Sequence, residues 1–467
     1  MTTSTDRTQR IIAIGYWLTV ATVIVVGYVW VHGRLTVHYL DDAWSTSFAY
    51  QFMRHDITED RVFRTAGTTP LLFGKTQAWL YGTLIAPFGW TRSHVHLIAS
   101  AVQLASAAAW AGIGRSMGLG REAATYLGVS LLLFGVGVKA ANLGRPDALT
   151  LLLISLALLA FVRARWLLAG LLVVVAFENH PIGLTGLFYL LGWGIHTRAD
   201  WLRDRRRALQ RLGLLALGAL LGLCWFVWAN RATLTAANLG KMFRGVQTFG
   251  EEQRTEWTYL HYYFKYHARP ELYGFLTCFA LFLVRRRDRH QAAPLWLLAM
   301  VLLSAVLARR QNEFYALLAY PAFALVCVHA LADAGRLRNW LLRLGFLLLL
   351  ANFAVQAREV WRERKTYHFE QTLAEVVQRV PADGLPVVGL SDFWFGFQER
   401  RFVPHAYQSP FPTLGFSSFY LVDSSIKPTG LVRIRGEIGD QWWATPIATF
   451  ADSATTQVRI LRYDPAR

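Results

Sequence analysis

The chain has 467 residues, of which 54% are hydrophobic and only 17% are charged. Soluble domains have roughly 25% charged residues, so this composition argues against a set of soluble domains and favours a membrane protein that crosses the bilayer several times. The net charge of +18 does not indicate nucleic-acid binding, because the Arg residues lie in short clusters between apolar runs, as the positive-inside rule predicts.

The first apolar run extends from Ile11 to Val31, about the 20 residues needed to cross the hydrocarbon core of a bilayer. We interpret this run as an uncleaved first transmembrane helix, with the N-terminus in the cytoplasm. The first outer loop, residues 32–92, follows. Its apolar segment 70–90 is predicted to be a helix on the outer membrane surface, because a span there would invert every later loop and break the charge rule.

Further apolar stretches predict the remaining transmembrane helices, about eleven in all. They lie at roughly 93–113, 123–138, 148–162, 166–178, 181–195, 212–229, 271–284, 293–308, 314–331 and 340–356. This topology puts the Arg-rich loops in the cytoplasm and the C-terminus outside it.

The pattern changes after residue 356, and residues 357–467 are more polar. Residues 366–380 have the pattern of an amphipathic helix, and the runs 386–390, 418–422 and 457–463 have the pattern of strands. The fold class is therefore mainly α: a transmembrane domain of residues 1–356 and a small extracytoplasmic α/β domain of residues 357–467.

The stretch HYLDDAWSTSFAYQFMRHD, residues 38–56, follows the first predicted span. Its adjacent carboxylates, Asp41 and Asp42, repel each other, so one of them can have a raised pKa and take part in proton transfer. The pair equally suits a solvated helix start, because Asp is a common N-cap. His55, near the end of the stretch, is a candidate to contact a substrate.

A second stretch, GRPDAL, lies at an outer helix entry and holds Arg145 and Asp147. Pro146 suits the first helical turn, and Asp147 suits the positive end of the helix dipole, which is a complete structural explanation. The functional alternative is an acidic group facing the same outer pocket as Asp41, with Arg145 binding a phosphate.

Two further stretches carry polar residues near the membrane exit. Arg309 and Arg310 are predicted to lie on the outer side of the membrane, where the positive-inside rule disfavours Arg. Binding of a lipid phosphate would explain their position, and Tyr315 could add a hydroxyl group to that site. The alternative is snorkelling at the interface. Glu178 and His180 could bind a substrate or cap a broken helix, and two ligands make a weak metal site.

These stretches, in this order, resemble the GT-C superfamily of membrane glycosyltransferases, in particular the aminoarabinose transferases and protein O-mannosyltransferases. The resemblance rests on the acidic pair Asp41–Asp42, on TTPLLFGKTQAW at 68–79, on GRPDAL at 144–149 and on RRQNEFYALLAYP at 309–321. It implies transfer of a sugar from a polyprenyl-phosphate carrier, such as undecaprenyl phosphate, to a lipid, glycan or protein acceptor outside the cytoplasm. Direct displacement by the acceptor would invert the anomeric centre. From the same resemblance we expect the protein in the inner, cytoplasmic membrane of a bacterium.

The resemblance also implies roles for individual residues. Asp41 would be the general base, Asp42 would orient it, and Asp147 would be a second acid. Arg309 or Arg310, with Tyr315, would bind the donor phosphate. The aminoarabinose transferases commonly have Lys-Pro where this chain has Thr69-Pro70, so Lys75 is the nearby alternative source of that charge. We predict that the protein needs no cofactor, and we assign none of its residues as a metal ligand. Dependence on a divalent metal stays open.

Two other functions are compatible with a membrane protein of this composition. A transporter or flippase for a lipid-linked sugar should carry charges within its transmembrane helices, arranged in paired halves. A non-catalytic scaffold would use the C-terminal domain for binding. The charges of this sequence lie mostly in its loops, which favours the transferase.

Overall fold

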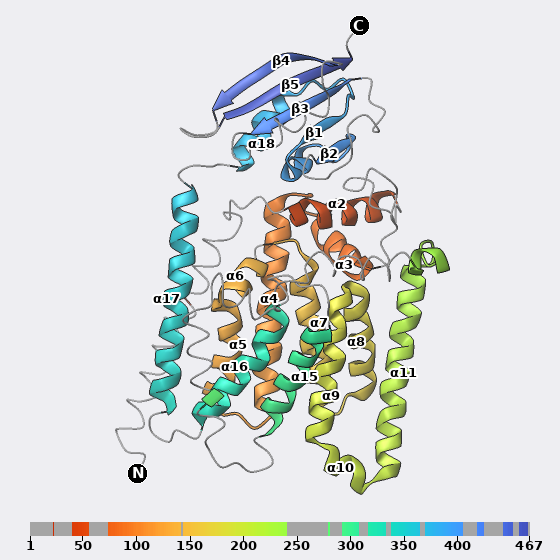
Figure 1. Ribbon diagram of the computed structural model, residues 1–467, viewed down its shortest axis with the longest axis vertical. Coiled ribbons are helices and arrows are strands. Elements are labelled where there is room, and N and C mark those ends of the chain that lie inside the picture. Colours follow the sequence, from red (N-terminus) through yellow and green to blue (C-terminus); the bar gives the residue numbers. More distant parts are fainter. Residues whose placement is uncertain are drawn as a thin grey trace.

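The structure, a computed structural model, describes residues 22, 40–55, 73–141, 143–240, 279–280, 292–307, 316–332, 338–364, 369–404, 418–424, 442–451 and 457–465. Over these residues the chain forms a bundle of helices with a small sheet beyond one end of it (Figure 1). The bundle consists of α4 (Arg92–Ser116), α5 (Arg121–Leu133), α6 (Gly135–Ala141), α7 (Pro146–Val162), α8 (Trp166–Asn179), α9 (Thr185–His196), α11 (Arg205–Ala229), α15 (Ala293–Leu307), α16 (Ala316–Ala332) and α17 (Arg338–Arg364).

Most of the predicted spans correspond to a single helix where the residues are described. Two do not: the span 123–138 is divided between α5 and α6 at the extended residue Phe134, and the span 181–195 begins in the 3-10 helix η1 (Pro181–Leu184) before α9. Two helices, Arg92–Ser116 and Arg205–Ala229, are long and apolar enough to cross a membrane by length and composition. Five shorter apolar helices accompany them in the described part of the chain. The predicted first span, 11–31, and most of 271–284 lie outside the described residues, so the number of about eleven spans stays a prediction.

Two helices from the predicted first outer loop, α2 (Leu40–His55) and α3 (Lys75–Ile85), lie over one end of the bundle, which we call the upper end (Figure 1). Within the segment 70–90, α3 is a short helix of 11 residues; that it lies on the membrane surface stays a prediction. Helix α10 (Arg198–Arg203) lies at the opposite end. The acidic motifs of α2 and of the start of α7 therefore lie at the end of the bundle opposite to the described Arg cluster of α10 and the start of α11 (Arg205–Ala229).

The last part of the chain, which we call the C-terminal domain, contains α18 (Phe369–Arg379), the 3-10 helix η6 (Ser391–Gly396) and a five-stranded sheet of order β2-β1-β3-β5-β4. The strands are β1 (Val387–Gly389), β2 (Phe402–Pro404), β3 (Phe419–Ser424), β4 (Trp442–Ala451) and β5 (Gln457–Pro465). Strand β1 pairs parallel with β2 and β3, whereas β5 pairs antiparallel with β3 and β4. The predicted helix and the three predicted strands are confirmed; β2 and β4 were not predicted.

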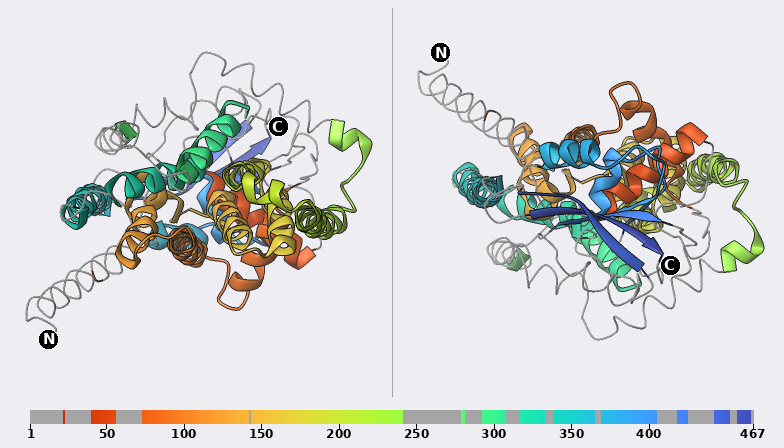
Figure 2. Two further views of the ribbon diagram at one scale, coloured as in Figure 1. Left: turned by 90° about the horizontal axis from the view of Figure 1, so that it is seen from below. Right: turned by 90° about the horizontal axis from the view of Figure 1, so that it is seen from above.

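The C-terminal domain covers the upper end of the bundle, directly above α2. Seen from above, the C-terminal domain lies over α2 and the upper end of α4, with α18 beside α2, and α17 and α11 are at opposite sides of the bundle (Figure 2). The indole ring of Trp394 packs edge-on against Tyr50 of α2, with ring centroids 5.8 Å apart. Helix α17 continues to Arg364, so the boundary predicted between residues 356 and 357 falls inside this helix.

Candidate active site

Helix α4 carries a polar stripe on an otherwise apolar sequence. Arg92, His96 and Ser100 are spaced four residues apart, which places them on one face of the helix. All three side chains are buried. Ser100 Oγ donates a hydrogen bond of 2.6 Å to the carbonyl oxygen of Ala141, so this face packs against the segment that leads into α7.

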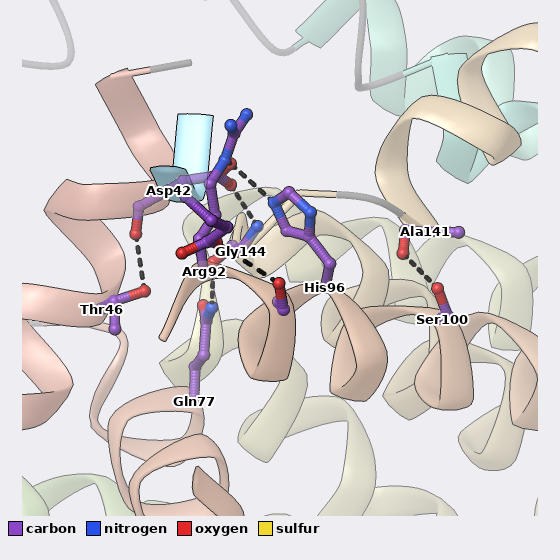
Figure 3. Close-up of polar contacts among 10 residues, drawn as sticks. Asp42, Thr46, Gln77, Arg92, His96, Ser100, Ala141 and Gly144 are labelled. Carbon is purple, nitrogen blue, oxygen red and sulfur yellow. Dashed lines mark hydrogen bonds and ion pairs between the residues drawn. The ribbon is translucent and has the colours of Figure 1, made fainter. Parts of the chain in front are cut away.

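Asp42, near the start of α2, lies against the same face of α4 and is completely buried (Figure 3). Its Oδ2 atom accepts a hydrogen bond from His96 Nε2 at 2.9 Å and lies 3.6 Å from Arg92 Nε. Its Oδ1 atom accepts a short hydrogen bond from the backbone N–H of Gly144. Both carboxylate oxygens of Asp42 are thus engaged, and the acidic pair is joined to α4 and to the segment before α7.

This environment keeps Asp42 ionised. Burial alone would raise the pKa of Asp42, but the His96 imidazole, the Arg92 guanidinium and the Gly144 amide stabilise the carboxylate. Together they hold its pKa below the ordinary value of 3.8. Of the two adjacent carboxylates, Asp42 is therefore not the one with a raised pKa.

Gly144 allows the close approach of these elements. A Cβ atom at this position would lie 2.6 Å from Val95 Cγ1 on α4, which is closer than real Cβ contacts. The Gly144 carbonyl oxygen accepts a hydrogen bond of 2.6 Å from Gln77 Nε2 on α3. Gly144 therefore links three elements: α2 through its N–H, α3 through its C=O, and α4 through van der Waals contact.

Asp147 lies in the first turn of α7, three residues after Gly144, and is completely buried. Its Oδ2 atom accepts a hydrogen bond of 2.7 Å from Arg145 Nε. Its Oδ1 atom and the Tyr81 hydroxyl are buried, and neither has a hydrogen-bond partner among the residues that the structure describes. Burial raises the pKa of Tyr81, and the negative charges of Asp147 and Asp42 raise it further.

Lys75, the first residue of α3, is also buried at this end. Its Nζ atom lies 5.2 Å from the centroid of the Phe48 ring of α2. Burial lowers the pKa of Lys75 to about 8, although the Glu178 carboxylate opposes the shift. Glu178 accepts hydrogen bonds from the backbone N–H groups of Lys75 at 3.0 Å and Thr76 at 2.8 Å, so it caps the N-terminus of α3.

The remaining predicted site residues are placed as follows. Asp41 belongs to α2, but its side chain lies outside the described structure. Arg309, Arg310 and Tyr315 also lie outside the described residues. His180 follows α8 at the upper end, where its Nδ1 accepts a hydrogen bond of 3.2 Å from the Ile182 N–H. His55 is exposed at the end of α2, with its ring 5.9 Å from that of Tyr50.

The sequence predictions did not include Arg92, His96, Gln77 and Tyr81. A signal for the first two was present, because polar residues at four-residue spacing within an apolar helix mark a buried polar face. Gln77 and Tyr81 gave no such signal on the short helix α3. Among the described residues, no three His, Cys, Asp or Glu side chains gather closely enough to hold a metal ion.

The fold is similar to that of two kinds of solved structure, an aminoarabinose transferase and an archaeal oligosaccharyltransferase, which confirms the predicted resemblance at the level of the fold. The chain is similar to the aminoarabinose transferase ArnT from Cupriavidus metallidurans. The ArnT structure bound to undecaprenyl phosphate matches with a TM-score of 0.61 and 14% sequence identity over 96% of this chain and 98% of ArnT. Apo ArnT gives a TM-score of 0.60 at 13% identity, with the same coverage.

An oligosaccharyltransferase from Archaeoglobus fulgidus, in its apo form, is also similar. It matches with a TM-score of 0.50 and 13% identity over 95% of this chain and 76% of the oligosaccharyltransferase. No family model matches the sequence, and no curated protein does. At these identities the likeness establishes the fold, and the chemistry has to be derived from the site.

Proposed function

We propose that this chain is a glycosyltransferase that takes a sugar from a polyprenyl-phosphate carrier and transfers it to a hydroxyl group of a lipid, glycan or protein. One observation carries the proposal. The buried Asp42 carboxylate is bound by the Gly144 N–H and by His96, which joins the acidic pair to the segment carrying Arg145 and Asp147. Acidic and basic side chains from separate parts of the sequence thereby meet at one end of the bundle.

In this proposal Asp41 is the general base and Asp42 positions it. Asp42 is a poor base, because both of its oxygens are engaged and its pKa is lowered. Asp41 takes the proton of the acceptor hydroxyl as the acceptor oxygen bonds to the anomeric carbon. The bond from that carbon to the phosphate oxygen breaks, and the polyprenyl phosphate leaves, so a single displacement inverts the anomeric centre. Asp147 acts as the second acid, near the acceptor or the sugar.

The cationic side chains bind the donor phosphate, which is also the leaving group. Lys75 presents a buried ammonium group, and Arg145 is held in place by Asp147. Arg309 and Arg310, with Tyr315, complete the phosphate site in this proposal. Positive groups fixed in advance around a departing phosphate stabilise its growing negative charge in the transition state.

Three further predicted residues have subordinate roles. Glu178 acts through Lys75, because its carboxylate is occupied by the first amides of α3. His180 and His55 lie at the same end of the molecule and are the candidates for contacts to the acceptor. Neither contributes to a described contact with Asp42 or Asp147.

The site would face away from the cytoplasm. The Arg clusters of α10 and the start of α11 lie at the end of the bundle opposite Asp42 and Asp147, as expected if that end is cytoplasmic. A transporter or flippase would need charged side chains along its path through the bundle. The charged side chains buried in the described part of the bundle belong to its upper end, which favours transfer over transport.

The test compares cells that lack the gene with cells complemented by wild type, by Asp41→Asn or by the control Asp200→Asn, an exposed carboxylate on α10 at the opposite end. Mass spectrometry of envelope glycolipids and surface proteins identifies the transferred sugar and its acceptor. We expect Asp41→Asn to lower transfer by about 10²-fold or more, which is typical for loss of a general base. The control should transfer normally.

Folding has to be measured in the same variants. Asp41→Asn protein purified in detergent should melt within a few degrees of wild type and still bind undecaprenyl phosphate, as measured by native mass spectrometry. An unchanged glycan profile in cells that carry Asp41→Asn would refute the proposed function. Transbilayer movement of a fluorescent polyprenyl phosphate, catalysed by the protein in liposomes, would support the transporter instead.

A further inference from the structure

The C-terminal domain contacts the two elements that carry the acidic site. It reaches α2 through η6 and the residues after it, and it reaches the start of α4 through α18. We propose that Glu399 and Phe369 of the C-terminal domain are positioning residues for the acidic pair: Glu399 holds α2, and Phe369 holds the guanidinium that pairs with Asp42. This inference rests on the proposed function, which it extends from the bundle to the C-terminal domain.

The first contact is the hydrogen bond between Tyr50 and Glu399. Tyr50 lies on α2, two turns after Asp42, and its hydroxyl donates to Glu399 Oε1. Its ring is almost completely buried and packs edge-on against Trp90 and Trp394, with centroid distances of 5.1 Å and 5.8 Å. Burial and the Glu399 carboxylate raise the pKa of Tyr50 to about 12, so this hydroxyl stays a donor at neutral pH.

The second contact places one guanidinium between the two parts of the molecule. Arg92 Cζ lies 5.1 Å from the centroid of the Phe369 ring at the start of α18, while Arg92 Nε lies 3.6 Å from Asp42 Oδ2. Only 2% of Arg92 is exposed. A cation over an aromatic ring is attracted to it. The Phe369 ring also keeps water away from the guanidinium. The Coulomb attraction between the Arg92 guanidinium and the Asp42 carboxylate is therefore severalfold stronger than the same attraction would be in bulk water, because the effective dielectric constant is lower.

Two further bonds fix the same short segment of the bundle. Gln398 Nε2 donates a hydrogen bond of 2.6 Å to the Trp90 carbonyl oxygen, two residues before Arg92. Ser93 Oγ donates a hydrogen bond of 3.4 Å to Glu370 Oε1 on α18. The C-terminal domain is therefore hydrogen-bonded to the chain both before Arg92, at Trp90, and after it, at Ser93.

The simpler explanation is an ordinary interface between packed domains. The placement of the contacts favours a positioning role instead, because Tyr50 lies on the same helix as Asp42, and Arg92 forms an ion pair with the Asp42 carboxylate. A shift of the C-terminal domain would therefore move both the helix that carries the acids and the cation that neutralises one of them. Small displacements of reacting groups have large effects on rates.

The experiment compares wild type with Glu399→Ala, Phe369→Leu and Glu399→Gln. The Gln variant keeps a carbonyl oxygen that can accept the Tyr50 hydroxyl, so it is the conservative rescue. Glu375→Gln is the matched control, because Glu375 lies on α18 and pairs only with Arg379 among the contacts of the described chain. All variants are full-length proteins purified in detergent.

The first measurement is hydrogen exchange of the α2 amides by mass spectrometry. Loss of one buried hydrogen bond should speed this exchange about fivefold in Glu399→Ala. Phe369→Leu should act in the same direction, and Glu399→Gln and Glu375→Gln should match wild type. Exchange as slow as in wild type in both Glu399→Ala and Phe369→Leu would overturn the inference. If Phe369→Leu fails to fold, the comparison of Glu399→Ala with Glu399→Gln still tests whether the C-terminal domain holds α2.

The second measurement is turnover, followed as release of undecaprenyl phosphate from an extract of the lipid-linked sugars of the expressing cells. We expect kcat to fall about tenfold in Glu399→Ala with KM unchanged, because misplaced acids affect the transition state rather than binding. A change in KM alone would overturn the positioning role. Failure of wild type to release undecaprenyl phosphate would refute the proposed function, and the exchange data would still decide whether the domain holds α2.

Discussion

The hydrogen bond between Asp42 and His96 should be one of the strongest single interactions at the upper end of the bundle. The carboxylate is fully buried and lies 2.9 Å from His96 Nε2. Hydrogen bonds to a charged group contribute about 1.5–3 kcal/mol each, and breaking a buried ion pair from one side costs about 3–5 kcal/mol. We therefore expect Asp42→Ala to lower the free energy of unfolding by about 3–5 kcal/mol.

A double-mutant cycle isolates the pair itself. Asp42→Ala, His96→Ala and the double variant are unfolded with sodium dodecyl sulfate in mixed micelles, and unfolding free energies are compared. The expected coupling energy is about 2 kcal/mol, since both partners lie in one buried network. The control cycle uses Asp200 and Arg203, an exposed ion pair 3.8 Å apart, whose coupling should be below about 0.5 kcal/mol. A coupling at Asp42 and His96 no larger than that of the control would refute the assigned network.

The dependence of stability on pH provides an independent check on the same carboxylate. Because the pKa of Asp42 is lower in the folded protein than its ordinary value of 3.8, its contribution to stability is complete above that value and is lost as the pH falls towards the folded pKa. The difference in unfolding free energy between wild type and Asp42→Asn should therefore shrink below about pH 4. A difference that stays constant down to pH 3 would contradict the assigned shift.

Three further predictions concern the neighbours of Asp42. Gly144→Ala should lower the free energy of unfolding by about 1–3 kcal/mol, and with it the melting temperature, because the added Cβ would lie 2.6 Å from Val95 Cγ1. The control Gly194→Ala should leave the melting temperature unchanged, because a Cβ there meets nothing within 4 Å. Affinity for undecaprenyl phosphate, measured by native mass spectrometry, should fall as the pH rises through 8, because the pKa of Lys75 is about 8; an equal fall in Lys75→Arg would contradict this assignment. Glu178→Ala should speed hydrogen exchange of the first α3 amides severalfold, because they lose their acceptor; unchanged exchange would argue against capping.

Local patterns in the sequence were enough to predict most of the elements. Apolar runs between Arg clusters predicted the helices of the bundle, since each helix satisfies its own backbone and needs only apolar side chains to stay in a membrane. Alternating and β-branched residues predicted β1, β3 and β5. Strands β2 and β4 were not predicted: they are the two edge strands of the sheet, and each contains a proline, Pro404 in β2 and Pro446 in β4, which lowers the strand signal.

The site could be predicted only in part, for a physical reason. Asp42 and Asp147 stand out in the sequence as carboxylates beside predicted membrane exits, but their local context suits a helix start equally well, and it was the family resemblance that assigned them to a site. The sequence alone could not show which donors occupy Asp42, because His96 is 54 residues away and the Gly144 N–H is 102 residues away along the chain. Only the packing of α2 against α4 and the segment before α7 determines that one Asp is buried and engaged, because hydrogen-bond partners depend on distance in space.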